Sequence, residues 1–366
     1  MQKQMKSLFT TMLAIGLFCQ SQAADLFTPV QKTELRAPSV PLITSDPYLS
    51  IWSPYDKLNE GSTEHWTGTE HPLIGAVRVD GKVYRFMGKQ TLEAILPMVE
   101  DEIWEGNYTF QQPAGSWTDI EYNANGWKTG KAAFGSSDRS MIGTPWKSEP
   151  DIWVRREFNL NEDLSNRPVY LKYSHDDVFE TKKKLRKGKN VIAAHCHNTT
   201  GGAYVDFGLF VPNNQTTAFE NLAIQKSVSV LPTQTYYTFA CGPVELNVVF
   251  TAPLMLDDLD LISTPVNYIS YQVRSIDKKQ HDVQVYIETT PQLAVNKPIQ
   301  PTIAKVIRRN GLSYIQAGTI DQPVTAHKGD LICIDWGYAY IAGNMNATTA
   351  VSLGDYNEMK STFASS

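Results

Sequence analysis

Alternating apolar and polar residues dominate positions 73–351 of the chain. Because successive side chains of a β-strand point to opposite faces, this period of two predicts half-buried strands. The clearest examples are residues 75–79, 191–196, 245–250, 268–273, 282–287 and 331–336. Asp80-Gly81 and Asn310-Gly311 lie between apolar flanks and predict tight hairpins. Only residues 92–104 and 355–363 have a pattern compatible with helices, so the sequence predicts an all-β protein of the sandwich type.

The first residues have the pattern of a secretory signal peptide. Two lysines precede a mostly apolar run over residues 8–18, and Ser21-Gln22-Ala23 has small residues at the two key cleavage positions. The run is shorter than the roughly 20 apolar residues of a membrane span. We therefore predict cleavage after Ala23, a periplasmic or extracellular location and no transmembrane segment. Cys19 offers a lipoprotein site as the alternative, which the bulky Phe18 before it disfavours.

Length, charge and cysteine content narrow the class of protein. A chain of 366 residues has room for two or three domains, and its net charge of −5 argues against nucleic acid as a partner. Three cysteines follow the leader, Cys196, Cys241 and Cys333, each in an apolar, strand-like context. This odd and sparse set predicts buried thiols instead of a disulfide framework. Oxidation of one pair outside the cytoplasm is the alternative.

Residues 35–88 contain two unusual phrases, SDPYLSIWSPYDKL and HWTGTEHPLIG. They resemble the opening of the glutaminase A family, a group of secreted bacterial and fungal proteins. A later stretch, LPTQTYYTFACGPVELNVVFTAPLMLDDLDLISTPVNYIS, is also similar to that family. The resemblance implies hydrolysis of the glutamine side-chain amide to glutamate and ammonia. It also implies a helical, α/α-barrel-like module that holds the hydrolytic residues, and DYNEMK near the end of this chain resembles the connector to that module.

Residues 117–210 form a separate unit in the sequence. The phrases TDIEYNANGWKTGKAAFG, TPWKSEPDIWVRREFNL and GKNVIAAHCHNTTGGAYVDFGL resemble the galactose-binding-like jelly roll that is the sugar-binding domain of glycoside hydrolase family 2. Asp176-Asp177 within SHDDVFE is another landmark of that domain. The resemblance implies a further hairpin after Glu180, but the chain continues directly into TKKKLRKGK. We therefore expect an incomplete jelly roll.

The two resemblances together predict the domain organisation. A large β-sandwich carries the jelly roll as an insertion, and the chain ends at the start of a connector. The predicted boundaries are residues 1–23 for the signal peptide, 24–100 for the first part of the sandwich, 101–212 for the jelly roll with an apparent deletion near 180–181, 213–345 for the remainder of the sandwich and 346–366 for the connector.

Two groups of polar and aromatic side chains are candidates for binding a small molecule or a carbohydrate. Asp258 and Asp260 belong to three carboxylates within four residues, which suits a cation, a polar substrate group or acid–base chemistry. The alternative is a solvated loop whose aspartates accept from backbone amides. Trp52, His65 and Trp66 belong to a polar, aromatic loop suited to a sugar ring or a glutamine-like ligand. Their alternative is an aromatic plug that seals the edge of the sandwich.

The remaining motifs carry weaker indications. Trp146, beside a proline in a loop, is the candidate for stacking on a sugar, whereas Trp127 and Trp153 lie in the most family-like phrases and are expected in the core. His195 and His197 share one face of a strand, but a zinc site needs further ligands and no CxxC or HExxH supplies them. We expect a solvent-facing histidine pair beside a buried thiol, with no metal and no cofactor.

No motif assigns a catalytic residue, so whether the chain is an enzyme by itself stays open. The resemblance favours the N-terminal, non-catalytic portion of a secreted glutaminase A-like amidohydrolase, in a supporting and substrate-gating role. A carbohydrate-binding or glycoside-hydrolase accessory protein is the alternative. A non-functional remnant of a larger gene is a third.

Overall fold

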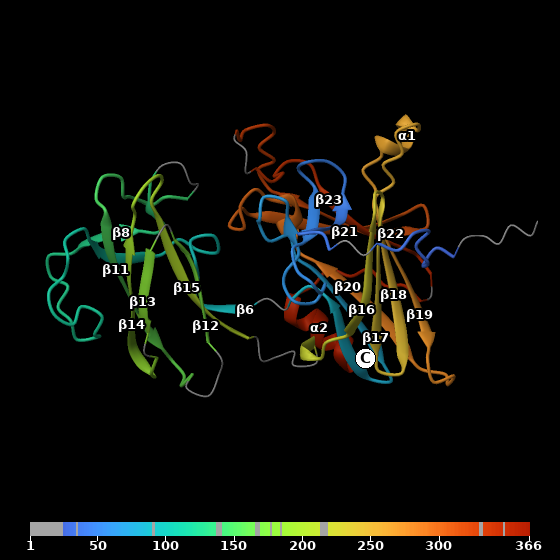
Figure 1. Ribbon diagram of the computed structural model, residues 1–366, viewed down its shortest axis with the longest axis horizontal. Helices are drawn as coiled ribbons and strands as arrows, with labels where there is room; N and C mark the ends of the chain where they lie inside the picture. Colours follow the sequence, from blue (N-terminus) through green and yellow to red (C-terminus); the bar gives the residue numbers. More distant parts are fainter. Residues whose placement is uncertain are drawn as a thin grey trace, which may run out of the picture.

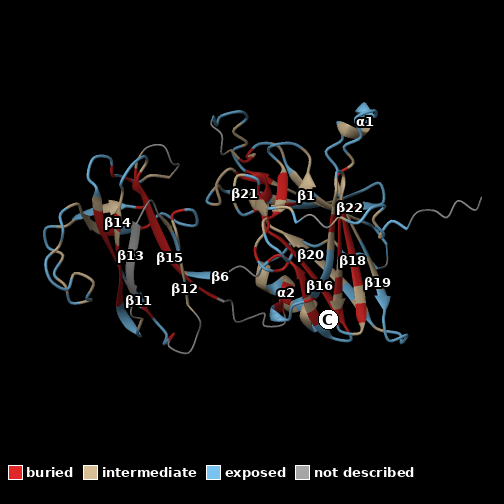
Figure 2. Cartoon of the chain, in the orientation of Figure 1, coloured by how far each residue is buried: buried red, intermediate tan, exposed pale blue. Residues whose placement is uncertain are grey.

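The structure is a computed structural model dominated by antiparallel strands (Figure 1). It describes residues 25–33, 36–89, 92–136, 141–164, 169–175, 178–183, 185–212, 219–328, 332–346 and 348–366. The described helices are short: α1 (Leu259–Ile262), the 3₁₀ helix η2 (Pro291–Ala294) and α2 (Tyr356–Ser365). The all-β prediction is confirmed. The strands form two lobes that lie side by side in Figure 1, each with its own buried interior in Figure 2.

The larger lobe, called the sandwich lobe, is built from four sheets. In order within each sheet, its strands are β16 (Ile224–Leu231), β17 (Gln234–Cys241), β18 (Val244–Thr251) and β19 (Tyr268–Ser275); β20 (Val283–Thr289), β4 (Leu73–Val79) and β5 (Lys82–Met87); β1 (Val40–Thr44), β2 (Ser50–Ser53) and β3 (Glu64–His65); and β21 (Thr302–Arg309), β22 (Leu312–Thr319) and β23 (Ala339–Asn344). The first two sheets face each other across a core that includes Phe86 and Phe239, whose ring centroids are 5.6 Å apart.

Two predicted hairpins of this lobe are confirmed. Asp80 and Gly81 join β4 to β5 with φ of 49° and 82°, and Asn310 and Gly311 join β21 to β22 with φ of 53° and 76°. Positive φ at both central residues is the type I′ arrangement, whose twist matches that of the paired strands. Asx-Gly pairs reach it at low cost, because glycine has no Cβ and asparagine or aspartate tolerates the left-handed region.

Two sequence-based elements are wrong. Residues 92–104 were expected to be helical, but β6 (Leu92–Leu96) is a strand paired with β15 (Tyr204–Pro212). Its short apolar pattern fits either period, and the partner strand that decides between them lies far away in the sequence. Residues 331–336 were expected to form a strand, but the described residues 332–336 have no regular structure. Side-chain hydrogen bonds hold this segment instead, among them one that the Cys333 amide donates to Asn296 Oδ1 at 3.0 Å.

The helix predicted at 355–363 is present as α2 and covers the outer face of β4. Its first turn is capped by Asp355 Oδ1, which accepts from the amides of Asn357 and Glu358. Phe363 packs on Phe219 and on a tyrosine of β20, and the strand residues Ile74 and Ala76 beneath them are buried. Strand β4 is therefore buried on both faces, which explains why Arg78 is its only charged residue.

Lys360 is the buried anchor of α2. Its side chain is 0 % exposed, and its Nζ lies 3.1 Å from Glu288 Oε1 and over the Tyr356 ring. Burial lowers the pKa of Lys360 to about 8, and the Glu288 carboxylate opposes this. Lys360→Met is expected to weaken α2 docking by about 2 kcal/mol, because the Glu288 carboxylate, which is 13 % exposed, loses its cation. Hydrogen exchange of the α2 amides measures the effect, with Lys305→Met on exposed β21 as the control; unchanged α2 protection would contradict the assignment.

The smaller lobe, called the jelly-roll lobe, consists of two five-stranded sheets. One sheet contains β13 (Val178–Lys183), β14 (Gly188–His197), β11 (Asp151–Leu160), β7 (Glu105–Thr109) and β8 (Lys128–Lys131), and the other contains β10 (Thr144–Pro145), β9 (Phe134–Gly135), β15 and β12 (Tyr170–His175), with β6 on β15. Its core, which includes Trp104, Phe134 and Phe207, shares no member with the core of the sandwich lobe.

The position of the expected deletion lies inside a paired strand. Glu180 belongs to β13, and residues 178–183 pair antiparallel with residues 192–197 of β14. The landmark Asp176-Asp177 lies outside the described residues, as does the predicted signal peptide at residues 1–23. In the described ranges, no helix is long and apolar enough to cross a membrane.

Candidate functional site

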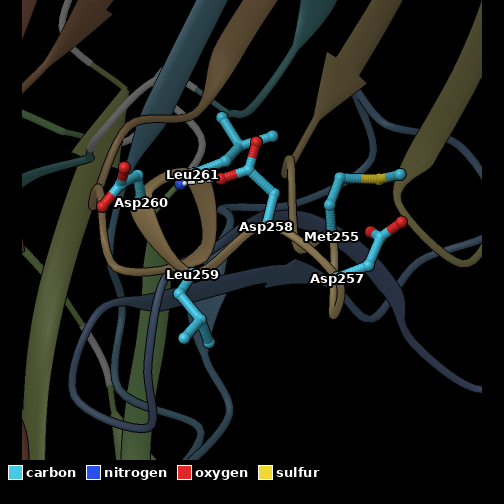
Figure 3. A pocket seen from close by; sticks show the side chains of 6 residues that line it. All are labelled: Met255, Asp257, Asp258, Leu259, Asp260 and Leu261. Atoms are coloured by element: carbon cyan, nitrogen blue, oxygen red, sulfur yellow. Dashed lines mark hydrogen bonds between the residues drawn. The ribbon is translucent and has the colours of Figure 1, made fainter.

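The acidic loop between β18 and β19 does not gather its carboxylates. Figure 3 shows Asp257, Asp258 and Asp260 pointing in different directions from a short loop that carries α1. Asp258 Oδ1 accepts from the Leu261 amide at 2.9 Å and caps α1, as the solvated-loop alternative predicts. The hollow beside them is open and lined by neighbouring residues of this one loop. The structure therefore does not bring Asp258 and Asp260 together as a site.

Trp146 is a core residue, and its interpretation as a stacking surface is wrong. The side chain is 0 % exposed, and its Nε1 donates to the Glu149 carbonyl at 2.7 Å. The buried indole finds an acceptor three residues away, so a loop position beside proline did not imply exposure. Trp153 is buried as expected, whereas Trp127 is half-buried and packs against Trp117 in a surface loop.

The paired histidines of β14 share one carboxylate. Asp151 Oδ1 lies 2.7 Å from His195 Nε2 and 2.8 Å from His197 Nδ1, and the Trp153 ring stacks on His195. Burial raises the pKa of Asp151, but the two histidine hydrogen bonds outweigh it and lower the pKa overall. Cys196, between them in sequence, is buried on the opposite face. Within the described part of the chain, no group of three or more histidine, cysteine, aspartate or glutamate side chains is arranged to hold a metal ion.

The residues that the structure does bring together lie in the HWTGTEH phrase. Residues 63–71 form a small hairpin, here called the histidine hairpin, in which the His65 amide donates to the Thr69 carbonyl at 2.8 Å and the His71 amide to the Thr63 carbonyl at 3.0 Å. Gly68 makes the turn with φ of 86°. Because strand residues alternate in direction, His65 and His71 face inward and are buried, whereas Glu64, Trp66 and Glu70 lie on the other side.

The hydrogen bonds of His65 define its tautomer. Its Nε2 lies 3.0 Å from the Pro47 carbonyl, which can only accept, so Nε2 carries the proton. Nδ1 is then the acceptor, and it lies 2.8 Å from Thr67 Oγ1 and 3.3 Å from the Thr67 amide. Trp66 Nε1 donates to the same Pro47 carbonyl at 2.5 Å, while the residue as a whole is 51 % exposed. The ring nitrogens of His65 and Trp66 are therefore occupied by hydrogen bonds within the protein.

Trp52 belongs to the same region but not to the same contacts. It is half-buried on β2 and its Nε1 donates to Ser50 Oγ at 2.7 Å. Strand β2 pairs with β3, so Trp52 supports the start of the histidine hairpin through the backbone. The structure thus places three of the six candidates, Trp52, His65 and Trp66, in one neighbourhood, with His65 as part of a plug.

The histidine hairpin contacts a residue that the sequence did not connect to it. Thr67 Oγ1 lies 3.2 Å from Thr69 Oγ1 and 3.7 Å from Cys333 Sγ. Burial raises the pKa of Cys333, although the two threonines oppose this. Only the thiolate is a nucleophile, so at neutral pH Cys333 is a structural thiol.

His71 is the least satisfied group of the hairpin. It is 0 % exposed, and in the described part of the chain neither ring nitrogen has a hydrogen-bond partner. Its ring centroid lies 5.1 Å from that of His65. Burial lowers the pKa of His71 to about 3, and the neighbouring His65 adds to the shift. His71 is therefore neutral, and a positive charge there is strongly disfavoured.

The outer side of the histidine hairpin faces the jelly-roll lobe. Glu70 Oε1 lies 3.8 Å from Lys172 Nζ on β12, an ion pair between exposed side chains of the two lobes. Glu64 accepts from the Tyr55 hydroxyl at 3.3 Å, and burial together with the Glu70 charge raises its pKa despite that bond. The hairpin therefore connects β2, the segment around Cys333 and the second lobe.

Comparisons with known proteins cover the sandwich lobe only in part. Two family models match the chain, one described as a domain of unknown function (DUF4964) over residues 12–98 and one as a domain of unknown function (DUF5127) over residues 233–366. Glutaminase A of Aspergillus oryzae (strain ATCC 42149 / RIB 40) is 30% identical over 119 residues. This stretch is 32% of the present chain but 15% of that enzyme, so the chain matches only a small part of its length. No solved structure matches.

The matches and the geometry concern the same segments. The histidine hairpin lies in the first matched segment, and Cys333 lies in the second. The strands of the jelly-roll lobe after β6 lie between the two matched segments. At the sequence level the similarity supports a relation to glutaminase A, while the likeness of the jelly roll to a sugar-binding domain stays a prediction.

Proposed function

We propose that this chain is the N-terminal, non-catalytic portion of an exported glutaminase A-like amidohydrolase, in which it supports the hydrolytic part. The observation that carries the proposal is the partial identity to glutaminase A of Aspergillus oryzae. The site geometry is consistent with a supporting role. The residues that meet in the matched segments, His65, Thr67 and Cys333, are used for internal hydrogen bonds. Export rests on the leader pattern of residues 1–23.

The first test is ammonia release from L-glutamine by the purified chain. We expect no release above that of the heat-denatured chain, with glutaminase A of Aspergillus oryzae as the positive control under the same conditions. The physical reason is that the thiol of Cys333 is protonated and buried, and the carboxylates Asp258 and Asp260 point apart. Sustained release in proportion to protein concentration, lost in Cys333→Ser, would contradict the non-catalytic role.

A segment exchange gives the positive test. In glutaminase A of Aspergillus oryzae, the matched stretch is replaced by the corresponding 119 residues of this chain. We expect the exchanged enzyme to keep releasing ammonia, because a supporting segment needs the same fold and not the same surface. Loss of release in an exchanged protein that still melts cooperatively would count against the proposal.

The carbohydrate-binding alternative has one observation in its favour. Trp117 and Trp127 pack with ring centroids 6.4 Å apart in a surface loop, and both are half-buried. Arg155, fully buried beneath, donates to the carbonyls of Trp117 and Asp119 and fixes this loop. Partly exposed, rigid indoles suit the flat face of a sugar ring. Retention on polysaccharide columns that Trp127→Ala abolishes would favour this alternative.

A further inference from the structure

We propose that the histidine hairpin is an acid-sensitive latch between the two lobes. Protonation of His71 opens residues 63–71, uncovers the Cys333 thiol and releases Glu70 from Lys172. The inference goes beyond the proposed function, because it concerns the coupling of the lobes and needs no substrate.

The closed hairpin depends on neutral imidazoles. His65 is satisfied as the Nε2–H tautomer, with the Pro47 carbonyl on one side and the Thr67 hydroxyl on the other. The His71 ring packs against this ring with 5.1 Å between centroids, and among the described residues neither of its ring nitrogens has a hydrogen-bond partner. A proton on His71 adds a second N–H without an acceptor and a charge without a counter-ion inside the plug. The cheapest relief is movement of His71 into water.

The charged groups around His71 offer little stabilisation to a proton on its ring. Asp46 lies on the β1–β2 loop, where its carboxylate accepts from the Tyr48 and Leu49 amides, and its charge acts on His65. Glu64 and Glu70 lie on the outer side of the hairpin. On the 332–336 segment, Cys333 is a neutral thiol.

Asp335 on that segment is committed elsewhere. It is buried, and its Oδ2 lies 2.8 Å from Gln300 Nε2 and 2.7 Å from His327 Nε2. Among the described residues, therefore, no carboxylate bonds to His71.

The direction of the pH dependence follows from the lowered pKa. In the closed hairpin the pKa of His71 is about 3, whereas in the open hairpin it returns towards the ordinary 6.5. Between these values the open form binds more protons, so the closed form loses stability as pH falls below about 6.5. From pH 7 to pH 5 the open fraction rises about 20-fold from this group alone. Burial also lowers the pKa of His65, which acts in the same direction.

Opening has two structural consequences because of where His71 lies. Its neighbour Glu70 carries the contact to Lys172 of the jelly-roll lobe. Thr67, near the turn of the same hairpin, contacts the Cys333 thiol, and Cys333 is 1 % exposed in the closed form. The thiol therefore reports the state of the latch.

The test measures thiol reactivity in the intact chain between pH 7 and pH 5. The reagent is 4,4′-dithiodipyridine, which reacts with thiols in acid, and peptide mass spectrometry assigns the modified cysteine. Cys196 and Cys241 are buried in the cores of the two lobes and serve as internal references for global unfolding. We expect the rate at Cys333, relative to both references, to rise about 20-fold. A ratio that stays constant over this range overturns the proposal.

A variant pair assigns the effect to His71. His71→Phe keeps an aromatic ring in the plug and removes the titration, so most of the acid-dependent rise at Cys333 is expected to disappear. His197→Phe, a histidine replaced in the other lobe, is expected to keep the full rise. An equal rise in His71→Phe and in the unchanged chain overturns the proposal. If His71→Phe does not fold, the ratio in the unchanged chain still decides.

Discussion

Arg85→Met is expected to destabilise the sandwich lobe by about 3–5 kcal/mol and to leave the jelly-roll lobe unchanged. Arg85 lies on β5, is 7 % exposed, and among the described residues its guanidinium donates to the backbone carbonyls of Asn59, Gly88 and Phe219. Methionine fills a similar volume but donates nothing, so three carbonyls in the interior lose their donor. Burial lowers the pKa of Arg85 to about 10, which still leaves it charged at neutral pH.

Calorimetric unfolding measures this prediction, because lobes with separate cores are expected to melt as separate units. The sandwich transition should fall by several degrees in Arg85→Met while the jelly-roll transition keeps its temperature. Arg309→Met, at an exposed position of β21, is the matched control and should change neither. A loss of stability below about 1 kcal/mol would show that the hydrogen bonds from Arg85 to the carbonyls of Asn59, Gly88 and Phe219 do not stabilise the sandwich lobe as proposed.

Asp206→Ala is expected to cost the jelly-roll lobe about 3 kcal/mol. Asp206 on β15 is 0 % exposed and accepts from the Val99 amide at 2.9 Å and from Trp104 Nε1 at 2.8 Å. Burial raises its pKa, although these donors and the Arg156 guanidinium oppose the shift. Alanine leaves the Val99 amide and Trp104 Nε1 without their acceptor. It also removes a negative charge that acts on the Arg156 guanidinium, which lies 4.3 Å from the centre of the Trp104 ring.

Calorimetric unfolding also measures this prediction, but here the jelly-roll transition is expected to change and the sandwich transition is the reference. Asp206→Ala should lower the jelly-roll transition alone. Asp206→Asn keeps one acceptor oxygen and should lose less, and Glu105→Ala, exposed on β7, should lose nothing measurable. Equal losses for alanine and asparagine would indicate that charge, and not the acceptor oxygen, carries the effect.

Local patterns predicted much of the fold. The hairpins at Asp80-Gly81 and Asn310-Gly311 follow from backbone preferences of the turn residues themselves, and α2 follows from its own period and cap. The helix prediction at residues 92–96 was wrong because five residues of mixed pattern do not distinguish a strand from a helix. Pairing with β15 decides between them. The strand prediction at residues 332–336 was wrong because side-chain hydrogen bonds, and not strand pairing, determine the conformation of this segment.

The candidate site was harder to predict because its contacts are not local. Thr67 and Cys333 are 266 residues apart, and no local pattern relates them. His65 was selected for its aromatic loop, but His71, six residues later, was not, although their alternation with Glu64 and Glu70 marks both as inward-facing. Trp146 was selected for its loop position beside a proline and Asp258 for its cluster of carboxylates, whereas the structure uses them for core packing and helix capping.

The central structural claim is that the described residues form two lobes with separate cores, with contacts such as the Glu70–Lys172 ion pair between them. The most direct test is the double variant Arg85→Met/Asp206→Ala, compared by calorimetry with each single variant. Distant sites in separate cores are expected to add within about 0.5 kcal/mol, with each transition displaced as in its own single variant. A single shared transition, or a coupling energy above about 1 kcal/mol, would contradict the two-lobe account.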